Sequence, residues 1–178
     1  QIASSQKGRV PPQDLEAERA VLGSILLDNE AAFVAIELLS PEDFYRPAHQ
    51  HVFTSMIELT TQSEPIDVVT LSSKLDSKSQ LEAVGGLSSL IGLSEAVPTA
   101  ANVKHYADLV RKKSMLRKLI AAATQIVRDA YEAPNPEEQV DLAEKMIFDI
   151  AKDKARQGIV PIAEIVATAF KQIEKLAE

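Results

Sequence analysis

The sequence of 178 residues contains no cysteine and no tryptophan, and only 4% of its residues are aromatic. Without cysteine there is no disulfide framework and no thiolate metal site, which fits a cytoplasmic protein. Without many aromatic side chains, a core must be built from Leu, Ile, Val and Ala. The chain has only six glycines. A sandwich or barrel needs many tight turns, so this scarcity favours an all-α fold.

Other absences concern partners. No apolar run approaches the roughly 20 residues that span a bilayer, and no signal peptide opens the chain, so we expect no membrane association. The net charge of −7 argues against nucleic acid as the main partner, because phosphate binding relies on clustered Lys and Arg. The chain begins with Gln1 rather than Met, so we expect it to be a piece of a longer protein.

Motifs for catalysis are also missing. The sequence has no G-x-x-x-x-G-K-[S/T] phosphate loop and no G-x-S-x-G elbow, so nucleotide hydrolysis and acyl transfer have no visible machinery. His49 and His51 would lie about 200° apart on a helix and could not chelate one metal together. His105 is far along the chain. We therefore predict no enzyme activity, cofactor or metal in this chain, and structural or surface roles for its histidines.

The first half predicts a compact bundle. Residues 1–12 are polar, end in Pro-Pro and predict an extended arm. Asp14 can cap a first helix, and Ser40-Pro41-Glu42-Asp43 is a second strong start signal. We place a globular helical bundle at residues 13–100. The helices predicted within it cover residues 15–26, 31–39, 47–59, 68–75, 80–84 and 87–96.

The second half predicts a helical hairpin at residues 101–156. Residues 101–131 contain neither Pro nor Gly and keep a helical apolar period, with a kink left open at residues 111–114. A helix of this length spans roughly 46 Å and should protrude from the bundle. Asn135 and Pro136 then start a second helix that returns antiparallel to about residue 156.

The returning helix has apolar residues on more than one face, and one neighbouring helix cannot cover them all. We therefore predict that two copies pair through the hairpin, with Leu142, Met146 and Ile150 in the dimer interface. The apolar residues on this helix are Val140, Ala143, Ile147 and Ile150 on one side, with Leu142, Met146 and Phe148 around it.

A flexible linker at residues 157–161 precedes a separate amphipathic helix at residues 162–178. An isolated helix of this length is marginal in water, and no chain remains to cover its apolar stripe. We expect this linker helix to dock on a neighbouring subunit, where the effective concentration is high. The docking residues are Ile162, Ile165, Val166, Ala169, Phe170 and Ile173.

Two features of the long helix have two interpretations each. The basic cluster of Arg111, Lys112, Lys113, Arg117 and Lys118 is either a solvated face paired with acids such as Asp108 or a local contact for an acidic partner. No aromatic residue interleaves it to stack bases, which weakens a nucleic-acid interpretation. Apolar residues farther along the same helix either pack in a core or contact a partner.

Several stretches, in order from Pro11 onward, resemble the N-terminal part of DnaB-type replicative helicases. They are Pro11-Pro12 with Glu16-Ala17-Glu18 and Val21-Leu22-Gly23; Leu27-Asp28-Asn29-Glu30; Asp43-Phe44-Tyr45 with His49, His51 and Phe53; Pro65-Ile66-Asp67 with Thr70-Leu71; Val84-Gly85-Gly86; Pro98-Thr99-Ala100-Ala101-Asn102; Tyr106-Ala107-Asp108; and Asp141-Leu142-Ala143-Glu144.

This resemblance implies a hexameric, ATP-driven helicase at the bacterial replication fork. Its N-terminal domains form a trimer-of-dimers collar that binds the helicase-binding domain of primase and communicates with the helicase loader. The linker helix packs on the motor domain of the next subunit, and ATP, Mg²⁺ and most DNA contacts belong to that motor, which this chain lacks. Positions tied to primase align with Ile120 and Ile126, and Gln139 stands where other members carry an apolar residue.

Two other classes stay open from the residues themselves. A generic helical adaptor or regulator unrelated to helicases would show no affinity for primase and no motor domain downstream. An enzymatic helical bundle is a third class, but the Glu-x-x-His spacing that builds a di-iron site is missing.

Overall fold

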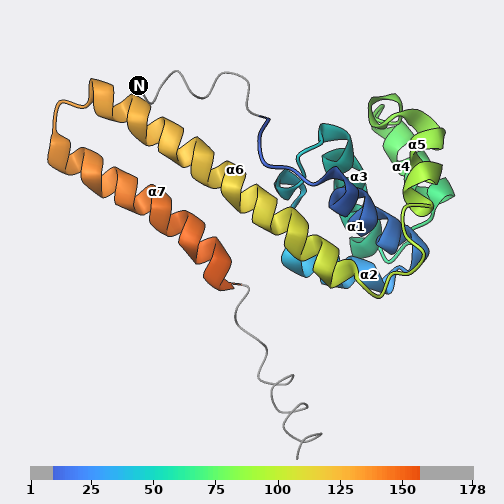
Figure 1. Ribbon diagram of the computed structural model, residues 1–178. Coiled ribbons are helices and arrows are strands. Elements are labelled where there is room, and N and C mark those ends of the chain that lie inside the picture. The colour runs from blue at the N-terminus through green and yellow to red at the C-terminus, as the bar shows by residue number, and fades with distance from the viewer. Residues whose placement is uncertain (1–9, 157–178) are drawn as a thin grey trace, which may run out of the picture. The chain divides into compact units, whose positions relative to one another are not determined.

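The computed structural model describes residues 10–156 and the side chains of residues 10–152. Every regular element in this part is a helix, so the predicted all-α fold is confirmed there (Figure 1). The elements are α1 (Leu15–Leu27), α2 (Glu30–Leu38), η2 (Pro41–Asp43), α3 (Pro47–Thr61), α4 (Val68–Ser77), η3 (Glu82–Val84), α5 (Gly86–Ser94), α6 (Val103–Glu132) and α7 (Pro136–Arg156).

Three helix starts follow from side-chain caps. Asp14 accepts a hydrogen bond from the backbone N–H of Ala17 at the start of α1. Asp67 accepts from the N–H groups of Val69 and Thr70 at the start of α4. Asn135 accepts from the N–H of Glu137 at the start of α7, where the sequence predicts this residue as the cap. Each cap satisfies donors that the first helical turn leaves unpaired.

The start signal at Ser40 produces only the single 3₁₀ turn η2, because a core residue follows it. Ser40 and Asp43 form a capping box, but the chain then becomes extended at Phe44. The Phe44 ring is buried 4.9 Å from the ring of Phe53, which fixes the extended backbone. The residue before Pro47 is also extended, as a following proline requires, and α3 begins at that proline.

The described chain falls into two compact units that divide between Lys118 and Leu119. The first unit is a bundle around one apolar core, and the buried residues Val103, Ala107 and Val110 of α6 belong to that core. The sequence predicts the end of the bundle at residue 100. The division comes later because the first turns of α6 have apolar residues that the bundle buries.

The second unit contains the rest of α6, a turn at residues 133–135, and α7, which runs back antiparallel (Figure 1). No break interrupts α6 at residues 111–114. Residues 1–9 of the predicted arm at residues 1–12 lie outside the described residues, as do the predicted linker at residues 157–161 and the predicted linker helix at residues 162–178. None of the described helices is both long enough and apolar enough to cross a membrane.

Candidate protein interface on the helical hairpin

One face of each hairpin helix is covered within the second unit. On α6, Ala122 is buried and Ile126 is half-buried, one turn farther along. On α7, Ala143, Met146 and Ile150 are half-buried at the same helical spacing. Because these positions recur every three or four residues, they mark the faces that the two antiparallel helices turn toward each other.

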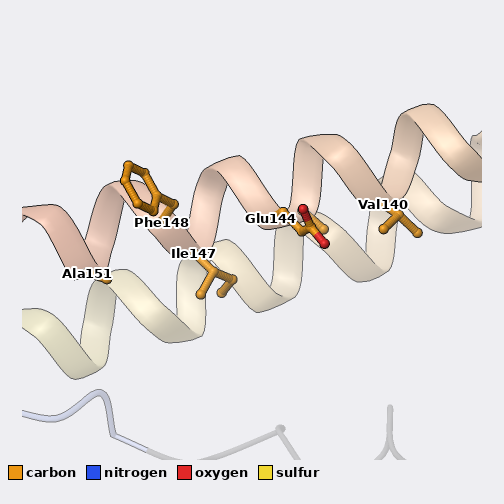
Figure 2. Close-up of a pocket in the computed structure, with 6 residues that line it drawn as sticks. Val140, Glu144, Ile147, Phe148 and Ala151 are labelled. Carbon is orange, nitrogen blue, oxygen red and sulfur yellow. The ribbon is translucent and has the colours of Figure 1, made fainter.

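The next face of α7 is apolar and open to solvent. Val140 is 57% exposed, Ile147 42% and Phe148 65%. Together with Ala143, Ala151 and the stem of Glu144 they line a shallow groove along the helix. Figure 2 shows Phe148 on the opposite edge of α7 from Val140 and Ile147, so the groove covers a broad part of the helix surface.

The corresponding face of α6 is also apolar and open. Leu116, Leu119 and Ile120 are each between 40% and 50% exposed, and Val127 and Tyr131 are exposed farther along the helix. Of these residues, the sequence analysis singled out only Ile120, as a position that aligns with primase contacts. Scattered apolar residues on a surface need no explanation, but two apolar stripes on neighbouring helices are typical of a protein interface.

Helical geometry places these two stripes on the same broad face of the hairpin. Ala123 follows the buried Ala122 by about 100° around α6, and Ile147 follows the half-buried Met146 by the same rotation around α7. Because the helices are antiparallel and face each other, an equal rotation turns both residues toward the same side. We call this side the apolar face and define it by Leu119, Ala123, Val140 and Ile147. Glu138 and Leu142 lie on the opposite face.

The residues predicted as primase contacts differ in exposure, and so do the residues predicted for the dimer interface. Ile120 is 48% exposed at the outer edge of the apolar face, whereas Ile126 is half-buried on the inner side of the hairpin. Leu142 is 54% exposed, whereas Met146 and Ile150 are already partly covered in one chain. The six linker-helix residues lie outside the described residues.

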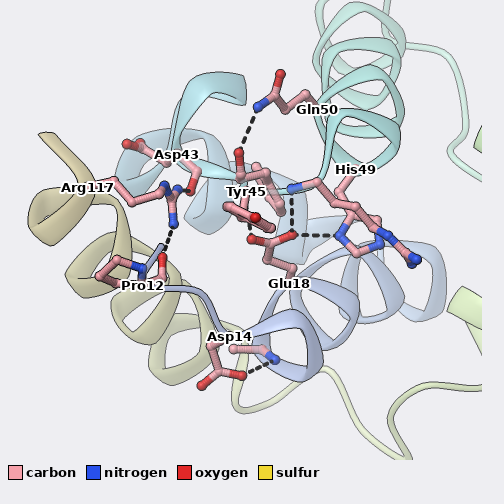
Figure 3. A network of polar contacts seen from close by, with 11 residues as sticks. Pro12, Asp14, Glu18, Asp43, Tyr45, His49, Gln50 and Arg117 are labelled. Atoms are coloured by element: carbon pink, nitrogen blue, oxygen red, sulfur yellow. Dashed lines mark hydrogen bonds and ion pairs between the residues drawn. The ribbon is translucent and has the colours of Figure 1, made fainter. Parts of the chain in front are cut away.

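Most of the basic cluster is engaged within the first unit. Arg117 donates hydrogen bonds to the backbone oxygens of Pro12 and Asp43, and its guanidinium lies 5.7 Å from the centre of the Tyr45 ring (Figure 3). Lys118 lies 3.4 Å from the Asp43 carboxylate, and Arg111 lies 3.4 Å from Asp108. The structure therefore favours the interpretation of a paired helix face for these three residues.

Asp43 is the centre of this polar cluster. Its carboxylate accepts hydrogen bonds from the Ser114 hydroxyl at 2.6 Å and from the Ser40 backbone N–H at 2.9 Å. Burial raises the pKa of Asp43, but these hydrogen bonds and the charge of Lys118 outweigh it, so the pKa lies below its usual value. The cluster attaches α6 to the η2 turn.

A second buried pair was missed by sequence reasoning. Glu18 is 1% exposed and accepts hydrogen bonds from the backbone N–H groups of Tyr45 and Arg46, and His49 Nδ1 lies 2.7 Å from its carboxylate (Figure 3). The only sequence signal was a charged residue among the buried apolar positions of α1. Its partners come from a distant segment, and helical periodicity cannot identify them.

A family model of the "DnaB-like helicase N terminal domain" matches residues 10–112, which is more than half of the chain. The chain belongs to this family. Unrelated helical adaptors and enzymatic bundles are therefore set aside. The DnaB-like match extends into α6 and includes the buried pair of Glu18 and His49.

Among similar proteins, the replicative DNA helicase DnaB of Geobacillus stearothermophilus is 43% identical over 94% of this chain, which spans 37% of the length of that relative. The solved N-terminal domain of DnaB helicase from Mycobacterium tuberculosis is 43% identical, with a TM-score of 0.76 over 79% of this chain and 99% of that domain. The solved N-terminal domain from Helicobacter pylori, described with its interactions with primase, is 28% identical, with a TM-score of 0.58 over 65% of this chain and 90% of that one.

Proposed function

We propose that this chain is the N-terminal scaffold of a hexameric replicative DNA helicase in the bacterial cytoplasm. In this proposal its copies pair through their hairpins and form a trimer-of-dimers collar at the replication fork. The observation that carries the proposal is an open apolar face on the hairpin of a DnaB-like domain. Such a surface is costly to leave in water, and a neighbouring molecule that covers it recovers that free energy.

The collar would also bind the helicase-binding domain of primase, with Ile120 and Ile126 as contacts. The described interaction of the Helicobacter pylori domain with primase supports this part of the proposal. Ile120 is accessible for such a contact, since it is exposed at the edge of the apolar face. Ile126 is half-buried, so a substitution there would alter primase binding partly by changing the shape of the hairpin.

Binding of the primase domain to this chain, measured by calorimetry, tests the assignment. Ile120→Asn should weaken binding on the order of tenfold, because removing an apolar anchor from an interface costs about 1–2 kcal/mol. Circular dichroism should show unchanged helix content. The matched control is Ala121→Asn, an exposed position on the opposite face of α6. Equal affinity of the Ile120→Asn variant and the parent chain would contradict the proposed contact.

Pairing through the hairpin can be tested by sedimentation equilibrium. Leu142, Met146 and Ile150 remain predicted interface residues, but Met146 and Ile150 are already partly covered. We therefore centre the proposed interface on Val140 and Ile147. Ile147→Asp should dissociate the dimer, because it would bury an unpaired charge, whereas Leu142→Asp should not. Dissociation by Leu142→Asp alone would instead support an interface through Leu142, Met146 and Ile150.

The remaining parts of the proposal concern the longer protein. The linker helix would dock on the motor domain of the next subunit and couple the subunits of the hexamer. ATP and Mg²⁺ would bind in that motor domain, which would also make most DNA contacts, and the collar would communicate with the helicase loader. These statements are supported by the replicative helicase that is 43% identical to this chain. The match covers only 37% of that relative, so the relative is much longer than this chain.

A further inference from the structure

The first unit has exposed apolar side chains that its own core does not use. Leu27 is 50% exposed, Phe33 60% and Val69 75%. Phe33 thus differs from Phe44 and Phe53, which are buried in the core. Single apolar residues on a surface need no explanation, so the arrangement of these three residues decides whether they form a site.

A side-chain clamp holds together the two segments that carry these residues. The side-chain amide of Asn29 donates a hydrogen bond to the backbone oxygen of Ile66 and accepts one from the Ile66 N–H, both at 2.8 Å. Asn29 has helical backbone angles and directly precedes α2. Phe33 follows it by four residues, so it lies on the side of α2 from which Asn29 reaches Ile66. The segment with Leu27 and Phe33 therefore lies beside the segment that leads into α4 and Val69.

Every charged side chain on the two clamped segments is acidic. Residues 27–39 and 61–69 contain five acidic residues and no Lys, Arg or His, and all five acids are exposed. Within the described part of the chain none of the five forms an ion pair, whereas Glu58 nearby on α3 pairs with Lys74 and Lys78. The five acids are Asp28, Glu30, Glu37, Glu64 and Asp67. We call the three apolar residues with these acids the acidic-rimmed patch.

The composition of the acidic-rimmed patch indicates the kind of partner that fits it. Glu30 and Glu37 lie three and four residues from Phe33 and border it on α2. The acids do not gather into a metal site among the described residues, so their charge forms a rim around apolar side chains. An apolar centre with a polar rim is typical of a protein interface. A rim of one sign attracts a basic partner and repels an acidic one within about 10 Å at 0.1 M salt.

We propose that the acidic-rimmed patch docks a basic segment of a partner protein. An apolar side chain of that segment packs against Phe33, and its Lys or Arg residues lie beside Glu30 and Glu37. The patch contains no residue of the hairpin, so this inference does not depend on the proposed pairing or on the primase contact. It gives the first unit a docking surface of its own.

Synthetic peptides of about 14 residues, a length at which a helix is marginal alone, test the chemistry of the partner. The basic probe has leucine at helical spacing on one face and lysine elsewhere. One analogue has glutamate in place of lysine, and another has serine in place of leucine. Calorimetry with the whole chain should show binding of the basic leucine peptide, binding weaker on the order of tenfold for the serine analogue, and none for the glutamate analogue. Equal binding of the serine analogue would overturn the proposal, because charge alone would then explain it.

A pair of apolar variants locates the site. Phe33→Ser should weaken binding of the basic leucine peptide about tenfold, because it removes the aromatic anchor. Ile91→Ser, at an exposed position in α5, should leave binding unchanged. Equal affinity of the Phe33→Ser variant and the parent chain would overturn the proposal. Sedimentation equilibrium of the Phe33→Ser variant should match that of the parent chain. A loss of self-association would show that a second copy covers the patch, and it would overturn the proposal too.

A pair of charge variants tests the rim. Glu30→Gln with Glu37→Gln should weaken binding of the basic leucine peptide more than Glu82→Gln with Glu95→Gln does. Both double variants remove the same net charge from exposed positions, but only the first pair borders Phe33. The difference should shrink as salt is raised, because salt screens exposed charges. Equal effects of the two double variants would show attraction to the chain as a whole and would overturn the proposed site.

Discussion

At the scale of single residues, Asp43 connects the stability of the first unit to pH. Its folded-state pKa lies below the ordinary value, so the stabilisation that it provides is complete above the unfolded-state pKa of about 3.9. That stabilisation is lost as the pH falls through the lower, folded-state pKa. Acid should therefore loosen the attachment of α6 to η2 before it affects the apolar core.

Asp43→Asn keeps the shape of the side chain and removes its charge. We expect the free energy of unfolding to fall by about 1.5–3 kcal/mol at pH 7, the usual value of hydrogen bonds to a charged group. The difference between the variant and the parent chain should shrink below about pH 4, where the parent carboxylate also becomes neutral. Urea unfolding followed by circular dichroism at pH 7 and pH 3 measures both values. A difference that does not depend on pH would show that the charge is not what stabilises the cluster.

At Ser55 we expect a substitution to raise the free energy of unfolding. Its side chain is fully buried in α3, and its hydroxyl has no hydrogen-bond partner in the described part of the structure. Ser55→Ala removes an unpaired polar group, so it should raise the free energy of unfolding by about 1 kcal/mol. Ser24 is the control, because its buried hydroxyl donates to the Ala20 oxygen at 2.7 Å. Ser24→Ala should not stabilise the protein, and thermal unfolding of both variants gives the comparison.

At the scale of elements, α1 and α5 approach so closely that only glycine fits between them. A Cβ atom on Gly23 would lie 2.4 Å from the Leu93 backbone oxygen, a distance that requires the helices to move apart. Gly23→Ala should therefore destabilise the first unit by about 1–3 kcal/mol, as overpacked core positions do.

Gly92 provides a matched control in α5. Nothing lies within 4 Å of a Cβ atom built there, so Gly92→Ala should stabilise the helix by about 0.5–1 kcal/mol. Denaturant midpoints of the two variants should move in opposite directions. If both alanines stabilised the protein, the close approach of the two helices would not be a feature of the folded state.

The same elements show what the sequence could and could not predict. Periodicity and caps located the helices of the described part within a few residues, because Asp14, Pro47 and Pro136 act locally. Periodicity could not show that Ile120 is exposed and Ile126 half-buried, because both residues belong to one apolar pattern. The difference arises because α7 packs beside Ile126. The sequence also gave no signal for the environment of Gln139. Its amide nitrogen is buried without a hydrogen-bond partner in the described hairpin, which costs folding free energy.

At the scale of the whole molecule, the linker helix is the part to test in the longer protein. Its residues lie outside the described ones, so its docking on a neighbouring subunit remains a prediction from the amphipathic pattern. Ile165→Asp with Phe170→Asp should convert hexamers of the full-length helicase into smaller species, because two charges would enter an apolar contact. Native mass spectrometry would show this, with Glu164→Ala as a control outside the stripe. Hexamers that persist unchanged would refute the docking role.

The continuity of α6 across the boundary of the two units has a consequence for how this domain can vary. A residue inserted between Lys118 and Leu119 would turn everything beyond it by about 100° and shift it by about 1.5 Å along the axis. Because α6 is unbroken at this point, no loop is available there to accommodate the extra residue. We therefore expect related chains to tolerate many substitutions in this stretch but to keep its length constant.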